Sequence, residues 1–277
     1  MKTLVFSATY NEAGNVRSLL AGIAQAAPHA DILIVDDGSK DGTAAAMREM
    51  QLPQLTIIER PGKMGLGTAH LLAFRYAMHH AYDVLVTMDA DGSHETSSIP
   101  HLLGKMDGPH DFAIGSRYAP GGSCDYSGYR LRVSQAANLA ARLLLNIRLT
   151  EFTTSFRAFK VARLQELPLS RLDMGGYSFF LTTVVECARR GFRMTEIPIH
   201  FRERGYGSSK IPPFEIFRGM QNLLRLVFVK AWGRPQSRQQ GDMQACAACG
   251  TTYSWISRQP DGASANPGVC VRCGVRS

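Results

Sequence analysis

Short apolar runs and segments of helical periodicity alternate through the first 120 residues. In the first helical segment the apolar positions are Val16, Leu19, Leu20 and Ile23, which share one face. We expect strands at residues 4–8, 32–35, 55–58, 82–88 and 112–114, and helices at residues 11–26, 41–50 and 67–80. Strands that alternate with helices predict βαβ units, and hence an α/β fold with a mostly parallel sheet flanked by helices.

The pattern changes after Tyr118. Gly, Ser and Pro in residues 119–128 predict a loop, and the following residues predict helices at about 133–147 and 177–189 and an edge-like strand at 193–201. Residues 214–232 are amphipathic, and the polar residues 234–242 are typical of a linker. We therefore expect a catalytic domain over residues 1–211, an amphipathic helix with a linker over 212–242, and a small module over 243–277.

The chain is basic, with a formal charge of +8 and a pI near 9.3. This balance favours an anionic partner, namely a nucleotide, a phospholipid surface or a nucleic acid. No apolar run reaches the ~20 residues that span a bilayer, and the N-terminus passes directly into a predicted strand. We therefore expect a cytoplasmic protein, or one that lies on the cytoplasmic face of a membrane.

Carboxylates follow two of the predicted strands. Asp36 and Asp37 come after residues 32–35, and Asp89 and Asp91 come after the strand that ends at Met88. The carboxyl ends of parallel strands meet at one edge of a sheet, where nucleotides commonly bind. Two carboxylates one residue apart suit Mg²⁺, which keeps open positions for substrate phosphates. A solvated turn is the alternative for this pair taken alone.

Two further segments carry candidate ligand-binding groups. Tyr10 and Glu12 follow the first strand, and they either line a base and ribose pocket or cap the first helix. Gly65 and Gly67 precede a predicted helix and would let the backbone approach a ligand closely. Lys63 is followed by Met, so this is not a Walker sequence, and an ordinary turn is nearly as good an interpretation.

Together these segments resemble glycosyltransferase family 2, and within it the polyprenyl-phosphate (dolichyl-phosphate) mannose synthases. The resemblance runs in order over about residues 3–230. The matching motifs are Thr-Tyr-Asn-Glu at 9–12, Val-Asp-Asp-Gly-Ser at 35–39, Gly-Lys-Met-Gly-Leu-Gly-Thr-Ala at 62–69, Asp-Ala-Asp-Gly-Ser-His at 89–94, Gly-Ser-Arg-Tyr at 115–118, Phe-Arg at 156–157, Ile-Pro-Ile at 197–199 and Arg-Gly-Tyr-Gly-Ser-Ser-Lys at 204–210.

The resemblance implies a GT-A-type, Rossmann-like domain that moves a hexose with inversion onto a polyprenyl phosphate. The implied donor is a nucleotide-diphospho-sugar. GDP-mannose is the favoured donor, and a UDP-sugar such as UDP-glucose is the alternative. The implied nucleoside contacts are Ala8, Tyr10, Glu12, Val35 and Asp37. The implied ligands that hold Mg²⁺ or Mn²⁺ against the diphosphate are Asp89 and Asp91, with the Ala90 backbone nearby. The resemblance further implies that the diphosphate is covered by Arg204 and Lys210, that Arg117 faces the reacting phosphates, and that the acceptor phosphate is bound by Arg130 and Ser134 together with Arg117. Asp91, Arg117 and Lys210 would be the catalytic groups.

The chain departs from the family pattern at three places. Residues 151–157 stand where members usually show Asp-x-Thr-Ser-Gly-Phe-Arg, and Ser155 replaces the glycine. Thr182 falls where many members carry Glu, and Ser93 falls where some relatives offer a third metal ligand. These differences concern recognition of the sugar and the acceptor more than the class of reaction.

The amphipathic segment at residues 214–232 has two interpretations. It is either a helix packed on the core or an interfacial helix on an anionic membrane, where Trp232, Arg218, Arg225 and Lys230 would suit the headgroup region. A polyprenol acceptor resides in a membrane, so we expect weak peripheral binding that salt releases.

Two Cys-x-x-Cys pairs lie near the C-terminus, Cys246 with Cys249 and Cys270 with Cys273. Their spacing is typical of a zinc ribbon, in which four thiolates close a tetrahedral structural site; iron is the alternative metal. The ribbon would serve as a docking module for a protein partner or as a cap that adds stability. A zinc-ribbon protein that binds nucleic acid is the alternative of another class. The dispersed basic residues and the lack of an aromatic-basic platform in the tail disfavour it.

Overall fold

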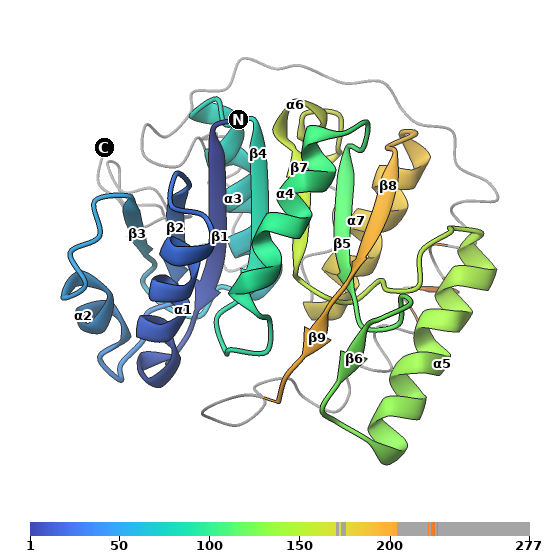
Figure 1. Ribbon diagram of the computed structural model, residues 1–277, viewed down its shortest axis with the longest axis horizontal. Helices are drawn as coiled ribbons and strands as arrows, with labels where there is room; N and C mark the ends of the chain where they lie inside the picture. The colour runs from blue at the N-terminus through green and yellow to red at the C-terminus, as the bar shows by residue number, and fades with distance from the viewer. Residues whose placement is uncertain (170–171, 173–175, 204–220, 222, 225, 227–277) are drawn as a thin grey trace, which may run out of the picture.

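The computed structural model describes residues 1–169, 172, 176–203, 221, 223–224 and 226 (Figure 1). The side chains of Arg130 and Tyr177 are outside this description. Arg204 and Lys210, most of the predicted amphipathic helix and the whole predicted ribbon, including its four cysteines, also lie outside the described residues.

A seven-stranded sheet forms the centre of the described part, in the order β3-β2-β1-β4-β7-β5-β8. Every neighbouring pair is parallel except those that β7 makes with β4 and β5. The strands are β1 (Thr3–Thr9), β2 (Asp31–Asp36), β3 (Leu55–Glu59), β4 (Val84–Asp89), β5 (Phe112–Ser116), β7 (Arg157–Lys160) and β8 (Met194–Pro198). The prediction of a mostly parallel sheet is confirmed. A small parallel pair, β6 (Ser123–Cys124) with β9 (His200–Phe201), lies beside it.

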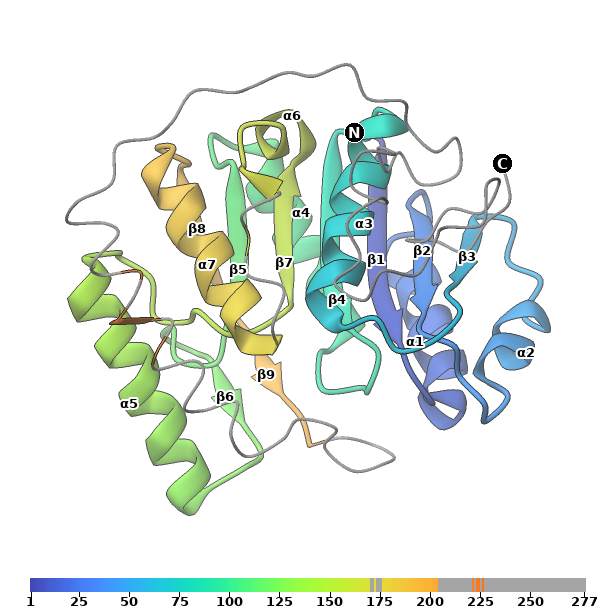
Figure 2. The same cartoon turned by 180° about the vertical axis from the view of Figure 1, so that it is seen from behind.

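Helices cover both faces of the sheet. Figure 1 shows α1 (Ala13–Ala26) and α4 (Ile99–Asp107) on one face, and Figure 2 shows α3 (Leu66–His79) and α7 (Gly176–Arg189) on the other. A hydrophobic core lies on each face of the sheet, and successive side chains of β1 point to opposite faces. Leu4 and Phe6 therefore pack toward α3, while Val5 packs toward α1. The remaining helices are α2 (Thr43–Arg48), the 3₁₀ turn η1 (Thr96–Ser98), α5 (Gly128–Leu145) and α6 (Val161–Leu164).

Four elements differ from the sequence prediction. α5 begins at Gly128, five residues before the expected start, and this glycine has a φ of +67° that suits a residue without Cβ. The single strand expected at 193–201 is two strands, because the chain leaves β5 after Pro198 and pairs with β6. Strand β7 and helix α4 were not predicted. None of the helices within the described residues is both long and apolar enough to cross a bilayer.

Candidate functional site

The carboxyl ends of β1, β2 and β4 lie side by side. Ala8 of β1 is in register with Val35 of β2 on one side and with Asp89 of β4 on the other. The structure therefore brings three of the predicted site residues to one edge of the sheet, as the parallel topology requires.

The two aspartates at the end of β2 have different surroundings. Asp36 is buried and accepts hydrogen bonds from Thr9 Oγ1 at 2.7 Å and from the amide of Ser39 at 2.8 Å. It fixes the turn that leaves the strand. Asp37 is also buried but points toward the loop before α3, where the amides of Met64 and Gly65 donate to its Oδ2 at 3.1 and 3.3 Å. Asp37 thus anchors the glycine-containing loop to the end of β2.

Arg60 forms the ion pair of Asp37. Its guanidinium is buried, contacts Asp37 Oδ1, and donates to Thr68 Oγ1 at 2.7 Å and to the carbonyl of Gly65 at 3.4 Å. Burial raises the pKa of Asp37, and Arg60 partly offsets this effect. Sequence reasoning missed Arg60; the available signal was an arginine at the end of a strand beside a matching motif.

Tyr10 and Glu12 lie beside this anchored loop. The Lys63 ammonium is 5.0 Å from the centroid of the Tyr10 ring, so the loops after β1 and β3 meet there. Glu12 precedes α1, but its carboxylate does not cap the helix; it accepts from Asn15 Nδ2 at 2.7 Å. The side chain is therefore held in place beside the end of β1.

Asp89 and Asp91 differ in exposure. The Asp89 side chain is 33% exposed, and its Oδ2 lies 3.3 Å from Nε2 of the buried His94. Burial of the surrounding region raises the pKa of Asp89, but hydrogen bonds from His94 and Ser155 outweigh it and lower the pKa to about 2. Asp91 is 6% exposed, and its Oδ1 accepts from the amide and hydroxyl of Ser93 at 3.0 and 2.6 Å.

This pair fits a hard divalent cation. The two carboxylates are two positions apart, and Asp89 remains partly open to solvent. Within the described ranges, no group of three His, Cys, Asp or Glu side chains assembles that could hold a metal. A cation at Asp89 and Asp91 would keep coordination positions for water and phosphate, which is the usual situation of Mg²⁺.

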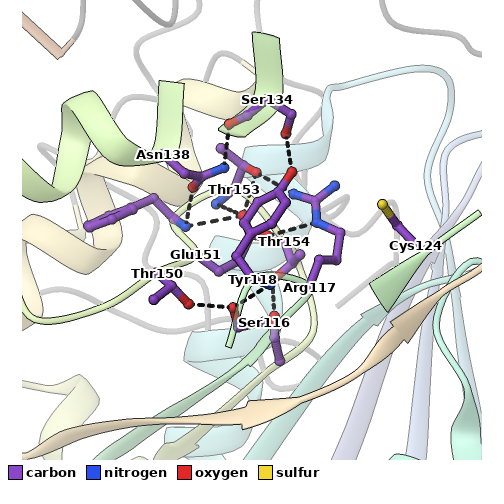
Figure 3. A network of polar contacts seen from close by, with 12 residues as sticks. Ser116, Arg117, Tyr118, Cys124, Ser134, Asn138, Thr150, Glu151, Thr153 and Thr154 are labelled. Carbon is purple, nitrogen blue, oxygen red and sulfur yellow. Dashed lines mark hydrogen bonds and ion pairs between the residues drawn. The ribbon is translucent and has the colours of Figure 1, made fainter. Parts of the chain in front are cut away.

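Arg117 follows β5 and lies in a network of polar contacts (Figure 3). It donates from Nε to Glu151 Oε2 at 2.7 Å, from Nη1 to the Tyr126 hydroxyl at 2.5 Å, and from Nη2 to Thr153 Oγ1 at 2.9 Å. Burial lowers the pKa of Arg117, but the Glu151 carboxylate outweighs this and raises it above its ordinary value. The guanidinium is therefore a fixed cation with a set orientation.

The network continues into α5. Tyr118 donates its hydroxyl proton to Ser134 Oγ at 2.7 Å, and Asn138 joins the same helix to the loop that precedes β7 by accepting from the amide of Phe152 at 2.8 Å. The structure thus brings together two of the three predicted acceptor-phosphate residues, Arg117 and Ser134, through Tyr118 (Figure 3). The third, Arg130, has a side chain outside the described part.

A second buried arginine shapes the loop that carries Glu151. Arg157 donates to the main-chain carbonyls of Phe152, Thr154 and Phe180 at 2.7–2.9 Å. Burial lowers its pKa to about 9. Because a buried guanidinium with three carbonyl acceptors holds the loop closed, Glu151 remains beside Arg117.

Comparisons with known proteins show to which family the chain is similar. The family model described as "Glycosyl transferase family 2" matches residues 4–168. The chain is 39% identical to the polyprenol monophosphomannose synthase of Mycolicibacterium smegmatis, over 79% of this chain and 84% of that protein. It is 36% identical to the undecaprenyl-phosphate mannosyltransferase of Micrococcus luteus, over 84% and 96% respectively.

Solved structures show the same fold. Glucosyl-3-phosphoglycerate synthase of Mycobacterium tuberculosis, in a complex with Mn²⁺, UDP and glucosyl-3-phosphoglycerate, superposes with a TM-score of 0.59 at 18% identity, covering 85% of this chain and 81% of that one. This likeness confirms the predicted GT-A-type fold. The family match over more than half of the chain, together with the two relatives, establishes that the chain belongs to glycosyltransferase family 2.

Proposed function

We propose that the protein transfers mannose from GDP-mannose, with inversion and with a divalent metal ion, to a polyprenyl phosphate. The main support for this proposal is that two groups of charged side chains lie along the carboxyl edge of the sheet. Asp89 is the last residue of β4 and Asp91 follows this strand, and Arg117, held by Glu151, lies after β5. The names of the two bacterial relatives, a polyprenol monophosphomannose synthase and an undecaprenyl-phosphate mannosyltransferase, support the sugar and the lipid class.

The residue inventory suits this reaction. An oxygen of the acceptor phosphate attacks C1 of the sugar, the bond from C1 to the diphosphate oxygen breaks, and the nucleoside diphosphate leaves with the electron pair. The attacking oxygen is already anionic at neutral pH, so no strong general base is needed. Mg²⁺ or Mn²⁺ at Asp89 and Asp91 would supply Lewis-acid stabilisation of the leaving diphosphate when bound.

The chain's own residues would do the remaining work. Arg117, with Ser134 and Arg130, would hold the acceptor phosphate, because a fixed guanidinium is preorganised for an anionic group. The proposed nucleoside contacts come from the edge formed by β1 and β2, namely Ala8, Tyr10, Glu12, Val35 and Asp37. Arg204 and Lys210 would stabilise the diphosphate. These two residues lie outside the described part, as do the four cysteines of the proposed zinc ribbon, so those roles stay predictions.

Removal of the metal is expected to stop transfer. Purified protein with undecaprenyl phosphate in detergent and GDP-mannose should form undecaprenyl-phosphate mannose in Mn²⁺, lose turnover at least a hundredfold in EDTA, and recover on addition of Mn²⁺. Mass spectrometry detects the product, and the anomeric coupling of the purified product reports inversion.

A donor panel in the same assay separates the alternatives. UDP-glucose and UDP-N-acetylglucosamine test the UDP-sugar hypothesis. Faster transfer from either one would overturn the choice of GDP-mannose, and EDTA-resistant turnover would overturn the metal requirement. Co-sedimentation with anionic liposomes at low and high salt tests the proposed peripheral membrane binding.

Replacing Arg60 with lysine is expected to weaken donor binding. Lysine keeps the charge beside Asp37 but loses the planar fork that also reaches Thr68 and Gly65, so the loop before α3 is less well fixed. We expect the KM for GDP-mannose to rise about tenfold, which corresponds to ~1.4 kcal/mol, with little change in kcat. Steady-state kinetics with saturating acceptor measures both quantities.

The matched control for this variant is Arg48→Lys. Arg48 pairs with Glu59 on the surface, where both side chains are largely exposed, and such pairs contribute little. An unchanged KM for GDP-mannose in Arg60→Lys, or an equal rise of this KM in Arg48→Lys, would contradict a role of Arg60 in holding the loop before α3.

A further inference from the structure

Phe201 lies between the two halves of the candidate site. The centroid of its ring is 5.1 Å from that of the His94 ring at an interplanar angle of 81°, and 4.9 Å from Cζ of Arg117. His94 in turn reaches Asp89 with Nε2 at 3.3 Å. An unbroken series of contacts therefore runs from Asp89 through His94 and Phe201 to Arg117.

The backbone holds Phe201 from both sides. It forms a bridge with His94, and the next amide, that of Arg202, donates to the carbonyl of Ser93 at 3.0 Å. On the other side Phe201 pairs with Cys124, and its carbonyl accepts from the amide of Asp125 at 3.0 Å. The loop after Asp91 and the loop after Arg117 are thus both tied to β9.

The Phe201 ring completes the constraints on Arg117. Hydrogen bonds to Glu151, Tyr126 and Thr153 fix the guanidinium at all three of its nitrogen atoms. Hydrogen bonds of this kind lie near the guanidinium plane and limit tilting only weakly, whereas an aromatic ring against a cation adds an attraction from another direction. The His94 ring is likewise held between two rings, because it also stacks on Phe156 at 5.3 Å and 20°.

We propose that Phe201 is a positioning residue that sets Arg117 and the His94–Asp89 pair at a fixed separation. The inference rests on the proposed function, in which Asp89 contacts the metal and Arg117 contacts the acceptor phosphate. It assigns to β9 the task of keeping these two groups in register during transfer. Loss of the ring would loosen both halves together.

The test compares Phe201→Leu with Phe201→Tyr and with a matched control. Leucine keeps apolar bulk and removes the ring, whereas tyrosine keeps the ring. The control is Phe192→Leu: Phe192 also carries an arginine over its ring, with Cζ of Arg163 at 4.6 Å, but it precedes β8 at the opposite end of that strand from Pro198. Thermal unfolding of all three variants establishes that each one is folded.

Two measurements read positioning without turnover. In a ¹H–¹⁵N spectrum of arginine-labelled protein, the Nε–H signal of Arg117, assigned by its absence in Arg117→Lys, should shift in Phe201→Leu and stay near its place in Phe201→Tyr. Phe192→Leu should shift only the signal of Arg163. Calorimetric titration of each protein with GDP in the presence of Mn²⁺ should show about fivefold weaker binding of Mn²⁺·GDP to Phe201→Leu alone.

Turnover supplies the third measurement. The kcat for mannosyl transfer should fall about tenfold in Phe201→Leu and stay within about twofold of wild type in Phe201→Tyr and Phe192→Leu. An unshifted Arg117 signal with unchanged Mn²⁺·GDP binding in folded Phe201→Leu would overturn the inference. If the wild-type protein transfers no mannose, the proposed function fails, and the spectrum and the titration still decide the role of Phe201.

Discussion

Asp91→Ala is expected to reduce sugar transfer by at least a hundredfold while the protein stays folded. Asp91 is one of the two carboxylates that the described residues offer to the proposed cation, and the loss of one preorganised stabilising group typically costs ~3 kcal/mol in the transition state. The structural cost is smaller, because the hydrogen bonds that Asp91 accepts from the amide and hydroxyl of Ser93 contribute about 1 kcal/mol each. Turnover at saturating Mn²⁺ and GDP-mannose, together with the thermal midpoint, measures the two effects separately.

The matched control for this result is Asp41→Ala. Asp41 makes the same kind of turn, since its Oδ1 accepts from the amide and hydroxyl of Thr43 at 3.1 and 2.5 Å, but it precedes α2 and is not one of the proposed metal ligands. Turnover within about fivefold of wild type is expected for it. Full activity of folded Asp91→Ala with added Mn²⁺ would remove the basis for a metal site at the end of β4.

The edge of the sheet could be predicted because it follows from topology. Once residues 4–8, 32–35 and 82–88 are parallel neighbours, the groups that follow each strand must lie together, whatever their distance in sequence. The register of Ala8 with both Val35 and Asp89 is the direct consequence. Local pattern sufficed here because apolar residues predominate in each of these strands.

The other half of the site depended on contacts that the local pattern does not encode. Strand β7 has four residues, includes the buried Arg157, and runs antiparallel between β4 and β5, so neither its length nor its direction was evident. Glu151 was noted only as a departure from a family pattern. Its meaning depends on Arg117, which lies 34 residues away in sequence and 2.7 Å away in space.

Arg60 and Phe201 show the same limit. Arg60 lies just before the glycine-containing motif at 62–69, yet its role comes from the buried carboxylate of Asp37, 23 residues earlier. Phe201 was the last residue of a predicted edge strand, and only the change of partner from β5 to β6 places its ring between His94 and Arg117. Residues that position other residues leave little trace in periodicity.

Glu151→Gln is expected to lower the free energy of unfolding by about 3–5 kcal/mol. Glu151 is fully buried and Arg117 nearly so, and removal of the carboxylate charge leaves the guanidinium without this counter-charge. Glutamine keeps an oxygen for the amides of Phe152 and Thr153, so the loss measures the charge more than the shape. Urea unfolding at pH 7 gives the value.

The exposed pair of Glu49 with Arg17 supplies the control, since Glu49→Gln should change stability by less than about 0.5 kcal/mol. Burial raises the pKa of Glu151, but Arg117 outweighs it and holds the folded pKa below the ordinary value of 4.5. The contribution of Glu151 is therefore complete above pH 4.5 and is lost as the pH falls through the folded pKa. The stability difference between wild type and Glu151→Gln should shrink below pH 4.5, and a difference that stays constant or grows there would show that the ionised carboxylate is not what holds Arg117 in place.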